Sequence, residues 1–244
     1  MPRSAARLLV VVPAWNEAES VGDVVRDVRT AVPEAECLVV DDGSSDETAD
    51  LARAAGARVL RLPYNLGVGG AMRAGFRYAR DRGYATVVQV DADGQHDPRD
   101  IPALVAALEN ADIAIGSRFA GVDGYGIRGP RRWAMRMLAW SVSRVARQHL
   151  SDVTSGFKAS GPRAVRLFAQ TYPAEYLGDT VEALVIAARA GLRIGERPVR
   201  MRERQAGAPS HRPLRATVYL GRAGIAFLVA MIQPRVPLPG EGAS

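Results

Sequence analysis

Ala85-Thr86-Val87-Val88-Gln89-Val90-Asp91-Ala92-Asp93-Gly94-Gln95 is the stretch that decides the fold. Its first six residues form a largely apolar run with the length and composition of a buried strand. Two carboxylates, Asp91 and Asp93, follow at the point where that strand ends. Ligands of open α/β sheets bind outside the carboxyl ends of the strands, and carboxylates there suit a hard divalent cation such as Mg²⁺ that also contacts phosphate. An acidic turn in solvent gives the same short pattern, so the rest of the chain has to separate the two interpretations.

Strand and helix signals alternate through the first half of the chain. The apolar runs predict strands at 8–12, 37–40, 58–62, 85–90 and 113–116. The segments between them predict helices at 20–31, 46–55, 70–82 and 98–109, and a further helix is predicted at 133–149. This alternation indicates an α/β fold with a largely parallel central sheet and helices on both faces.

Composition and charge narrow the class of protein. Hydrophobic residues make up 48% of the 244 residues, which is too many for a disordered chain. The single cysteine, Cys37, excludes an internal disulfide framework and favours a reducing, cytoplasmic compartment. Residues 1–117 hold 12 basic and 18 acidic residues, a net charge of −6, whereas residues 118–244 hold 20 basic and 8 acidic residues, a net charge of +12. The basic half lacks the aromatic-studded motifs of nucleic-acid modules, which leaves an anionic membrane or a phosphorylated substrate as its partner.

Polar clusters follow three of the predicted strands. They are Pro13-Ala14-Trp15-Asn16-Glu17, Asp41-Asp42-Gly43-Ser44-Ser45-Asp46 and the 91–95 segment. The carboxyl ends of parallel strands meet at one edge of a sheet, so we expect these clusters to converge there. Ser45 or Asp46 has either a helix-capping role or a ligand role. The glycines of the 65–70 segment allow close backbone approach to a phosphate.

The order of these motifs resembles that of the family 2 glycosyltransferases, which have the GT-A fold. The resemblance covers residues 7–212. It rests on the segments 13–17, 41–46, 65–70, 91–95 and 116–118. The continuation into His96 and Pro98, and the run Asp152-Val153-Thr154-Ser155-Gly156-Phe157-Lys158, are similar to the dolichol- and polyprenyl-phosphate mannose synthase branch.

The resemblance implies a binding site for a nucleotide diphosphate sugar, with GDP or UDP as the nucleotide. Glu17 and Asp42 would contact the base and ribose. The full implied donor set is Pro13, Ala14, Asn16, Glu17, Asp42, Gly67, Asp91, Ala92 and Asp93. Asp93 and Gln95, assisted by Asp91, would hold Mg²⁺ or Mn²⁺.

The same resemblance implies inverting transfer of the sugar to a polyprenyl monophosphate. The implied catalytic residues are Asp93, Arg118, Arg131 and Asp152, and the implied acceptor-phosphate ligands are Arg118, Arg131, Arg132, Arg202 and Arg204. Arg118 has a second interpretation, in which it pairs with a nearby carboxylate. A rival function is transfer to a soluble hydroxyl, for which Asp152 or Asp179 would be the base. A non-catalytic sugar-nucleotide-binding protein is the third possibility.

The last apolar stretch, 216–232, is interrupted by Arg222 near its centre, which disfavours a membrane span. We expect a catalytic domain over 1–212, an amphipathic helix over 213–234 and a disordered tail over 235–244. The helix would lie on the inner face of the cell membrane, contact a second subunit of a homo-oligomer, or close the core of its own domain.

Overall fold

The computed structural model describes residues 7–118, 130–173, 179–202, 221, 224–225 and 227–232, without the side chains of 130–134 and 179. The strands are β1 Leu8–Ala14, β2 Glu36–Asp41, β3 Arg58–Arg61, β4 Thr86–Gln89, β5 Ile113–Ser117, β6 Lys158–Ser160 and β7 Ile194–Pro198. The α-helices are α1 Val21–Ala31, α2 Thr48–Ala54, α3 Gly67–Asp81, α4 Ile101–Ala106, α5 Pro130–Ala146, α6 Pro162–Thr171 and α7 Asp179–Arg189. Two short 3₁₀ turns, Pro98–Asp100 and Ala107–Glu109, flank α4.

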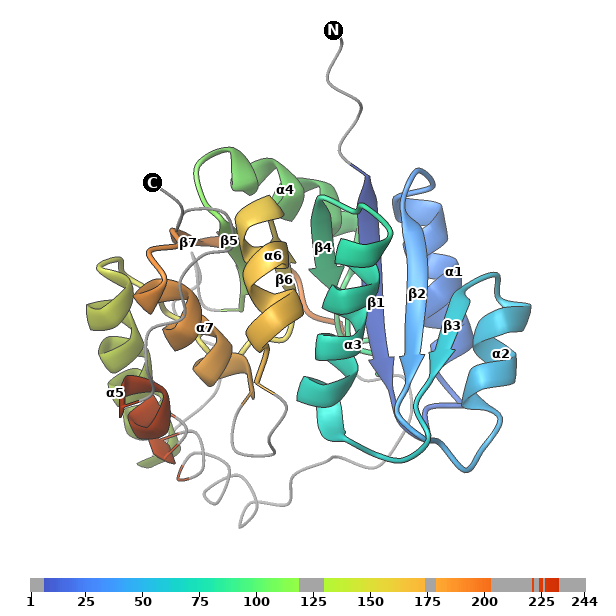
Figure 1. Ribbon diagram of the computed structural model, residues 1–244, viewed down its shortest axis with the longest axis horizontal. Helices are drawn as coiled ribbons and strands as arrows, with labels where there is room; N and C mark the ends of the chain where they lie inside the picture. Colours follow the sequence, from blue (N-terminus) through green and yellow to red (C-terminus); the bar gives the residue numbers. More distant parts are fainter. Residues whose placement is uncertain are drawn as a thin grey trace, which may run out of the picture.

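One seven-stranded sheet runs through the described part of the chain in the order β3-β2-β1-β4-β6-β5-β7 (Figure 1). All neighbouring pairs are parallel except the two pairs that involve β6, which is antiparallel to β4 and to β5. The predicted α/β class and the largely parallel sheet are therefore confirmed.

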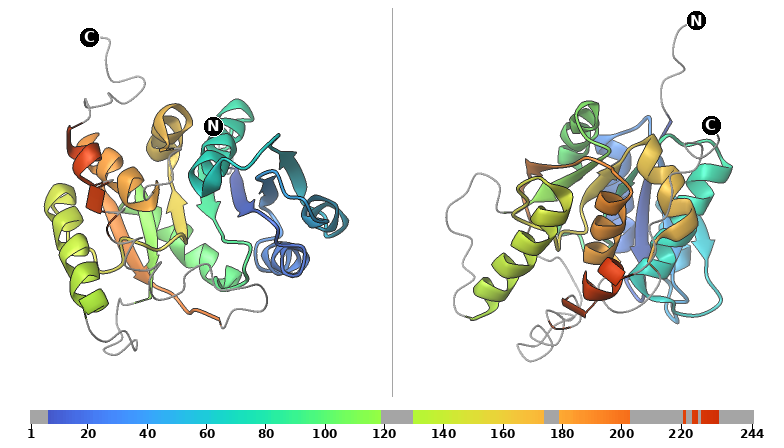
Figure 2. Two further views of the ribbon diagram at one scale, coloured as in Figure 1. Left: turned by 90° about the horizontal axis from the view of Figure 1, so that it is seen from below. Right: turned by 60° about the vertical axis from the view of Figure 1, so that its left-hand side comes forward.

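Helices cover both faces of this sheet, as the view from below in Figure 2 shows. The strand residues that point one way pack with α3, α5, α6 and α7, and those that point the other way pack with α1, α2 and α4. The strands β1, β2 and β5 bury apolar side chains on both faces, which is why their sequences are nearly continuous apolar runs. Helix α3 approaches β1 closely at Gly75, where a Cβ atom would lie 2.7 Å from Val11 Cγ1.

The predicted elements of the first half all occur, with ends shifted by a few residues. The single helix predicted at 98–109 is α4 with its two 3₁₀ turns, and the helix predicted at 133–149 is α5, which begins at 130. The elements β6, α6, α7 and β7 were not predicted. They complete the sheet beyond β4 and cover one of its faces.

The C-terminal segment has helical geometry at 221, 224–225 and 227–232. Ala230 is fully buried and Phe227 packs against the same core cluster. The side chains of Ile225, Leu228 and Ile232 are exposed. This helix therefore closes part of the domain core with one side and presents apolar side chains with the other. No helix among the described residues is long and apolar enough to cross a membrane.

Candidate active site

Three loops meet at the carboxyl edge of the sheet. β1 ends at Ala14, β2 at Asp41 and β4 at Gln89. β1 lies between the other two strands and is parallel to both. The loops that follow are therefore neighbours, which confirms the predicted convergence.

Asn16 joins the first two of these loops. Its φ of 52° lies in the left-handed region, which Asn tolerates better than most residues. The Asn16 backbone N–H donates to Ser44 Oγ at 2.9 Å, and Asn16 Oδ1 accepts from the Ser45 backbone N–H at 2.9 Å. The next residue, Glu17, donates its backbone N–H to Thr48 Oγ1 at 2.9 Å. These bonds fix the shape of the edge.

Pro13, Ala14 and Asp46 lie near Asn16 and contribute to the structure of this edge. Pro13 and Ala14 are buried residues of β1, so they could contact a ligand only through their main-chain atoms. Asp46 accepts the backbone N–H groups of Thr48 and Ala18 at 3.0 Å and 3.2 Å. Asp46 thus holds the residues that lead into α2, whose N-cap position is Glu47, and its ligand role stays a prediction.

Asp42 holds the turn that leads into α3. It is 3% exposed, and its Oδ1 accepts the Leu66 backbone N–H at 2.8 Å. Burial raises the pKa of the Asp42 carboxyl, against the hydrogen bonds from Leu66 and Gly67. Gly67 begins α3 with a φ of 79°, a conformation that favours glycine. The contact of Asp42 with a base or ribose stays a prediction.

Asp91 stands directly after β4, with its side chain 38% exposed. Its Oδ1 accepts from Gln89 Nε2 at 3.2 Å, and its backbone N–H donates to His96 Nδ1 at 3.1 Å. The His96 Nε2 atom lies 3.7 Å from Asp91 Oδ2. The buried His96 ring stacks on Phe157, with 4.8 Å between ring centroids. Asp91 is thus contacted by residues of its own strand and of the following loop, and the 152–158 segment packs against it.

Gly156 explains why the 152–158 segment approaches so closely. A Cβ atom at this position would lie 2.7 Å from Asp91 Oδ2. The missing side chain therefore provides the space that the carboxylate fills.

Asp93 shapes the loop that carries it. Its Oδ1 accepts the Gln95 backbone N–H at 3.0 Å, and Gly94 between them has a φ of 75°. Ala92 is buried, whereas Asp93 and Gln95 are partly accessible. Among the described residues no group of three or more His, Cys, Asp or Glu side chains is arranged to hold a metal ion. The loop therefore offers two carboxylates and an amide rather than a closed cage.

Arg202 has a different environment from the one predicted. The segment 200–202 forms a bridge with residues 95–97, and the Arg202 backbone N–H donates to the carbonyl at 95 at 2.9 Å. The Arg202 guanidinium pairs with Asp27 and, at 2.8 Å, with Asp97. Arg202 thus holds the 200–202 segment beside the 95–97 segment. Two carboxylates already neutralise its guanidinium.

Asp97 anchors that contact over a wide pH range. Hydrogen bonds from Arg99, followed by those from Arg202, hold the pKa of the buried Asp97 at about 2. Because the pKa in the folded state lies below the ordinary value, the stabilisation is complete above about pH 4 and is lost only as the pH falls towards 2.

Arg118 pairs with Asp152, which is the second of its two interpretations. Arg118 Nε lies 2.7 Å from Asp152 Oδ2 and Nη2 lies 2.9 Å from Oδ1. Asp152 is 1% exposed, and its backbone N–H donates to Glu196 Oε1 at 2.8 Å. The ion pair is therefore observed, and the catalytic roles of Arg118 and Asp152 stay predictions.

For several predicted residues the structure does not describe the side chain or the whole residue. Arg131 and Arg132 belong to the first turn of α5, but their side chains are not described. Arg204 falls in the undescribed segment after 202, and the side chain of Asp179 is likewise not described. Their roles stay predictions.

Sequence reasoning missed three residues of this region: His96, Gly156 and Glu196. His96 and Gly156 belong to segments quoted for the resemblance, but only their spatial contact with Asp91 shows what they do. Glu196 belongs to a strand that was not predicted.

Comparison with known proteins identifies the family. The profile described as Glycosyl transferase family 2 matches residues 9–169. An undecaprenyl-phosphate mannosyltransferase of Micrococcus luteus is 37% identical over 211 residues, which cover 82% of this chain and 86% of that protein. A polyprenol monophosphomannose synthase of Mycolicibacterium smegmatis is 36% identical over 172 residues, which cover 64% of this chain and 62% of that protein.

Solved structures agree on the fold. Glucosyl-3-phosphoglycerate synthase of Mycobacterium tuberculosis with phosphoglyceric acid superposes with a TM-score of 0.69, at 23% identity, over 94% of this chain and 81% of that chain. The same synthase with Mn²⁺, UDP and glucosyl-3-phosphoglycerate gives a TM-score of 0.68 at the same identity, over 94% of this chain and 81% of that chain. The chain is a glycosyltransferase with the GT-A fold; it belongs to glycosyl transferase family 2 and resembles the polyprenyl-phosphate mannosyltransferases.

Proposed function

We propose that this enzyme transfers a sugar, with inversion, from a nucleotide diphosphate sugar to a polyprenyl monophosphate. The observation that carries the proposal is the position of Asp91 and Asp93 after β4, at the edge of the sheet where the loops that follow β1 and β2 also lie. The relatives named for polyprenyl-phosphate mannosyl transfer support the acceptor.

A divalent cation, Mg²⁺ or Mn²⁺, would be held by Asp91, Asp93 and Gln95. The oxygen donors of these side chains fit such an ion, and Mg²⁺ is commonly held by one or two carboxylates together with substrate phosphates. The cation would offset the negative charge that develops on the leaving nucleoside diphosphate. Solved structures of the similar synthase contain Mn²⁺ or Mg²⁺ together with UDP.

The acceptor needs positioning more than activation. A phosphate monoester is already anionic near neutral pH, so no strong general base is required, and catalysis becomes a matter of placing and stabilising charge. Arg118, Arg131, Arg132 and Arg204 are the proposed source of positive charge on the acceptor side. The rival transfer to a soluble hydroxyl needs a free carboxylate base, and the ion pair of Asp152 with Arg118 argues against Asp152 in that role.

The test of this function is a two-part assay. A thermal-shift panel of GDP- and UDP-sugars, with and without Mn²⁺ or Mg²⁺, identifies the donor, because a ligand that binds the folded state raises the apparent stability. The identified donor is then offered polyprenyl phosphate or a water-soluble hydroxyl acceptor. Transfer to the soluble acceptor alone would overturn the proposed acceptor and leave the donor site intact.

A membrane surface is the proposed partner of the end of the molecule formed by α5 and the helical residues 224–225 and 227–232. Both elements pack on the same core cluster and lie at the same end of the molecule in Figures 1 and 2. Trp140 and Met137 of α5 are exposed, and the cationic Arg144 lies 5.1 Å from the centroid of the Trp140 ring. Aromatic, aliphatic and cationic side chains together suit the interface of an anionic bilayer at the cytoplasmic side.

We therefore expect the protein to bind liposomes that contain anionic lipid. The binding should weaken as salt is raised from about 0.1 M to about 0.5 M, because salt screens the attraction between exposed charges. The double variant Leu228→Ser/Ile232→Ser should weaken liposome binding by roughly tenfold or more, since each buried aliphatic side chain contributes ~1.5–3 kcal/mol. Leu51→Ser, which changes an exposed leucine on α2, is the matched control and should bind as the parent protein does. Salt-independent binding, or equal loss in the control, would contradict this surface.

Gly156→Ala is expected to reduce turnover by roughly tenfold or more, because even 1 Å of misplacement in a site is costly. The added methyl group would displace the Asp91 carboxylate, while the free energy of unfolding should change little, since the neighbouring atoms belong to the end of a side chain. Gly22→Ala on α1, where the atoms nearest to the added Cβ belong to the Arg26 guanidinium, is the control. Steady-state kinetics measure the turnover of both variants, and urea unfolding measures their stability. An active Gly156→Ala enzyme would show that the position of Asp91 tolerates change.

A further inference from the structure

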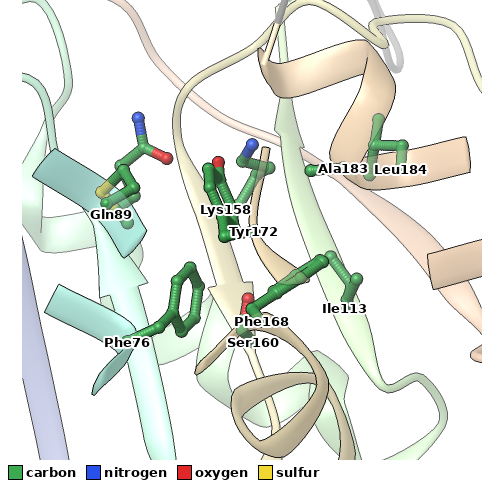
Figure 3. A pocket seen from close by; sticks show the side chains of 10 residues that line it. Phe76, Gln89, Ile113, Lys158, Ser160, Phe168, Tyr172, Ala183 and Leu184 are labelled. Atoms are coloured by element: carbon green, nitrogen blue, oxygen red, sulfur yellow. The ribbon is translucent and has the colours of Figure 1, made fainter. Parts of the chain in front are cut away.

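A small cavity lies under the active-site edge, between β4, β6, α6 and α7. Its apolar wall includes Met72, Phe76 and Phe168, and Gln89, Lys158 and Tyr172 bring polar atoms to it (Figure 3). The cavity volume is about 10 Å³. That is room for about one water molecule, so the polar groups do not form a ligand pocket.

Gln89 connects this cavity to the active site. The residue is 3% exposed. Its Nε2 donates to Asp91 Oδ1 at 3.2 Å, whereas its Oε1 is buried and has no hydrogen-bond partner among the described groups. A buried amide oxygen without a partner is destabilising, and an aliphatic side chain would fill the same space without that cost. Packing therefore does not explain a glutamine at the end of this strand.

Lys158 lies beside Gln89 in the sheet. It is the direct partner of Gln89 across the antiparallel β4–β6 pair, so the two side chains lie on the same face of the sheet. Lys158 is 6% exposed. Figure 3 shows the Gln89 oxygen on the side of Tyr172 and Lys158, with the Gln89 nitrogen pointing away from them. An ammonium group has only donors, so it favours the orientation in which the amide oxygen faces it and the NH₂ group is left for Asp91.

We propose that Gln89 is a positioning residue, which holds the Asp91 carboxylate in place through its amide NH₂ group while Lys158 fixes the direction of that amide. This inference rests on the proposed role of Asp91 in binding the cation and the donor diphosphate. Gln89 acts on Oδ1, His96 lies beside Oδ2, and Gly156 leaves the space between them. The carboxylate is thereby restrained before any ligand arrives.

The test is a double-mutant cycle on Gln89→Leu and Asp91→Asn, read as the Mn²⁺-dependent affinity for GDP or UDP in calorimetry. Hydrogen bonds to charged groups are worth about 1.5–3 kcal/mol, so Gln89→Leu should weaken that affinity by roughly tenfold or more. In the Asp91→Asn background the same change should have no further effect. Urea unfolding should show little change for Gln89→Leu, since it removes the unpartnered oxygen together with the bond to Asp91.

Met72→Leu is the matched control, because it changes the wall of the same cavity at similar volume and is expected to leave the affinity unchanged. Equal losses from Gln89→Leu in both backgrounds, or a loss of stability with unchanged affinity, would overturn the positioning role. An Asp91→Asn protein with the parent affinity would instead overturn the proposed role of Asp91, which separates the two failures.

Discussion

Asp93→Ala should remove nearly all sugar transfer, with a loss of roughly 100-fold or more in turnover, because the charge stabilisation that a bound cation supplies to a leaving group is worth several kcal/mol. The variant should also lose the Mn²⁺- or Mg²⁺-dependent part of nucleotide binding. Binding of the base and ribose, on the β1 and β2 side of the edge, should persist. The measurements are steady-state transfer, and calorimetry with GDP or UDP in the presence and absence of the cation.

Asp93→Asn separates charge from loop shape in this experiment. Asp93 Oδ1 accepts the Gln95 backbone N–H, and the amide oxygen of asparagine can accept the same bond. We expect Asp93→Asn to keep the loop and still lose most of the activity. Asp50→Asn, a change at an exposed carboxylate on α2, should behave as the parent. An active Asp93→Asn enzyme that also tolerates EDTA would rule out the proposed cation.

The sequence predicted the half of the fold in which local pattern and tertiary role agree. Strands such as β1 and β2 are buried on both faces and have helices between them, so their apolar runs are visible in the chain. β6 has only three residues and includes the buried Lys158. A strand this short has too little periodicity to be recognised, and its antiparallel direction depends on β4 and β5, which are distant in sequence.

The same limit applies to the site. Parallel strand order brings three loops to one edge, so the positions of Glu17, Asp42 and Asp91 follow from topology alone. The contacts that decide what a charged residue does are not local: Arg118 pairs with a residue 34 positions away, and Arg202 with one 175 positions away. A sequence motif supplies the residue type, but only the folded chain shows which arginine is already neutralised.

The ion pair of Arg118 with Asp152 leads to the second prediction with a large expected effect. Arg118 directly follows β5. Besides its ion pair with Asp152, its Nη2 donates to Thr154 Oγ1 at 3.1 Å. Arg118→Lys keeps the charge but loses the planar fork that fits both carboxylate oxygens. We expect this variant to lose roughly 100-fold in transfer to polyprenyl phosphate, of the size found when one oriented donor is removed from a site. Nucleotide affinity should change little, because the donor loops follow other strands.

Asp152→Asn gives the comparison that distinguishes the two acceptor chemistries. If Asp152 only orients Arg118, the loss should be smaller than in Arg118→Lys, because asparagine still accepts one hydrogen bond from the guanidinium. If Asp152 were the general base for a hydroxyl acceptor, Asp152→Asn would be the more damaging change, since an amide cannot take up the proton.

Urea unfolding supplies the structural readout. Arg118→Ala leaves a buried carboxylate without its cation and should cost about 3 kcal/mol of the free energy of unfolding, whereas Asp152→Asn removes the buried charge itself and should cost less.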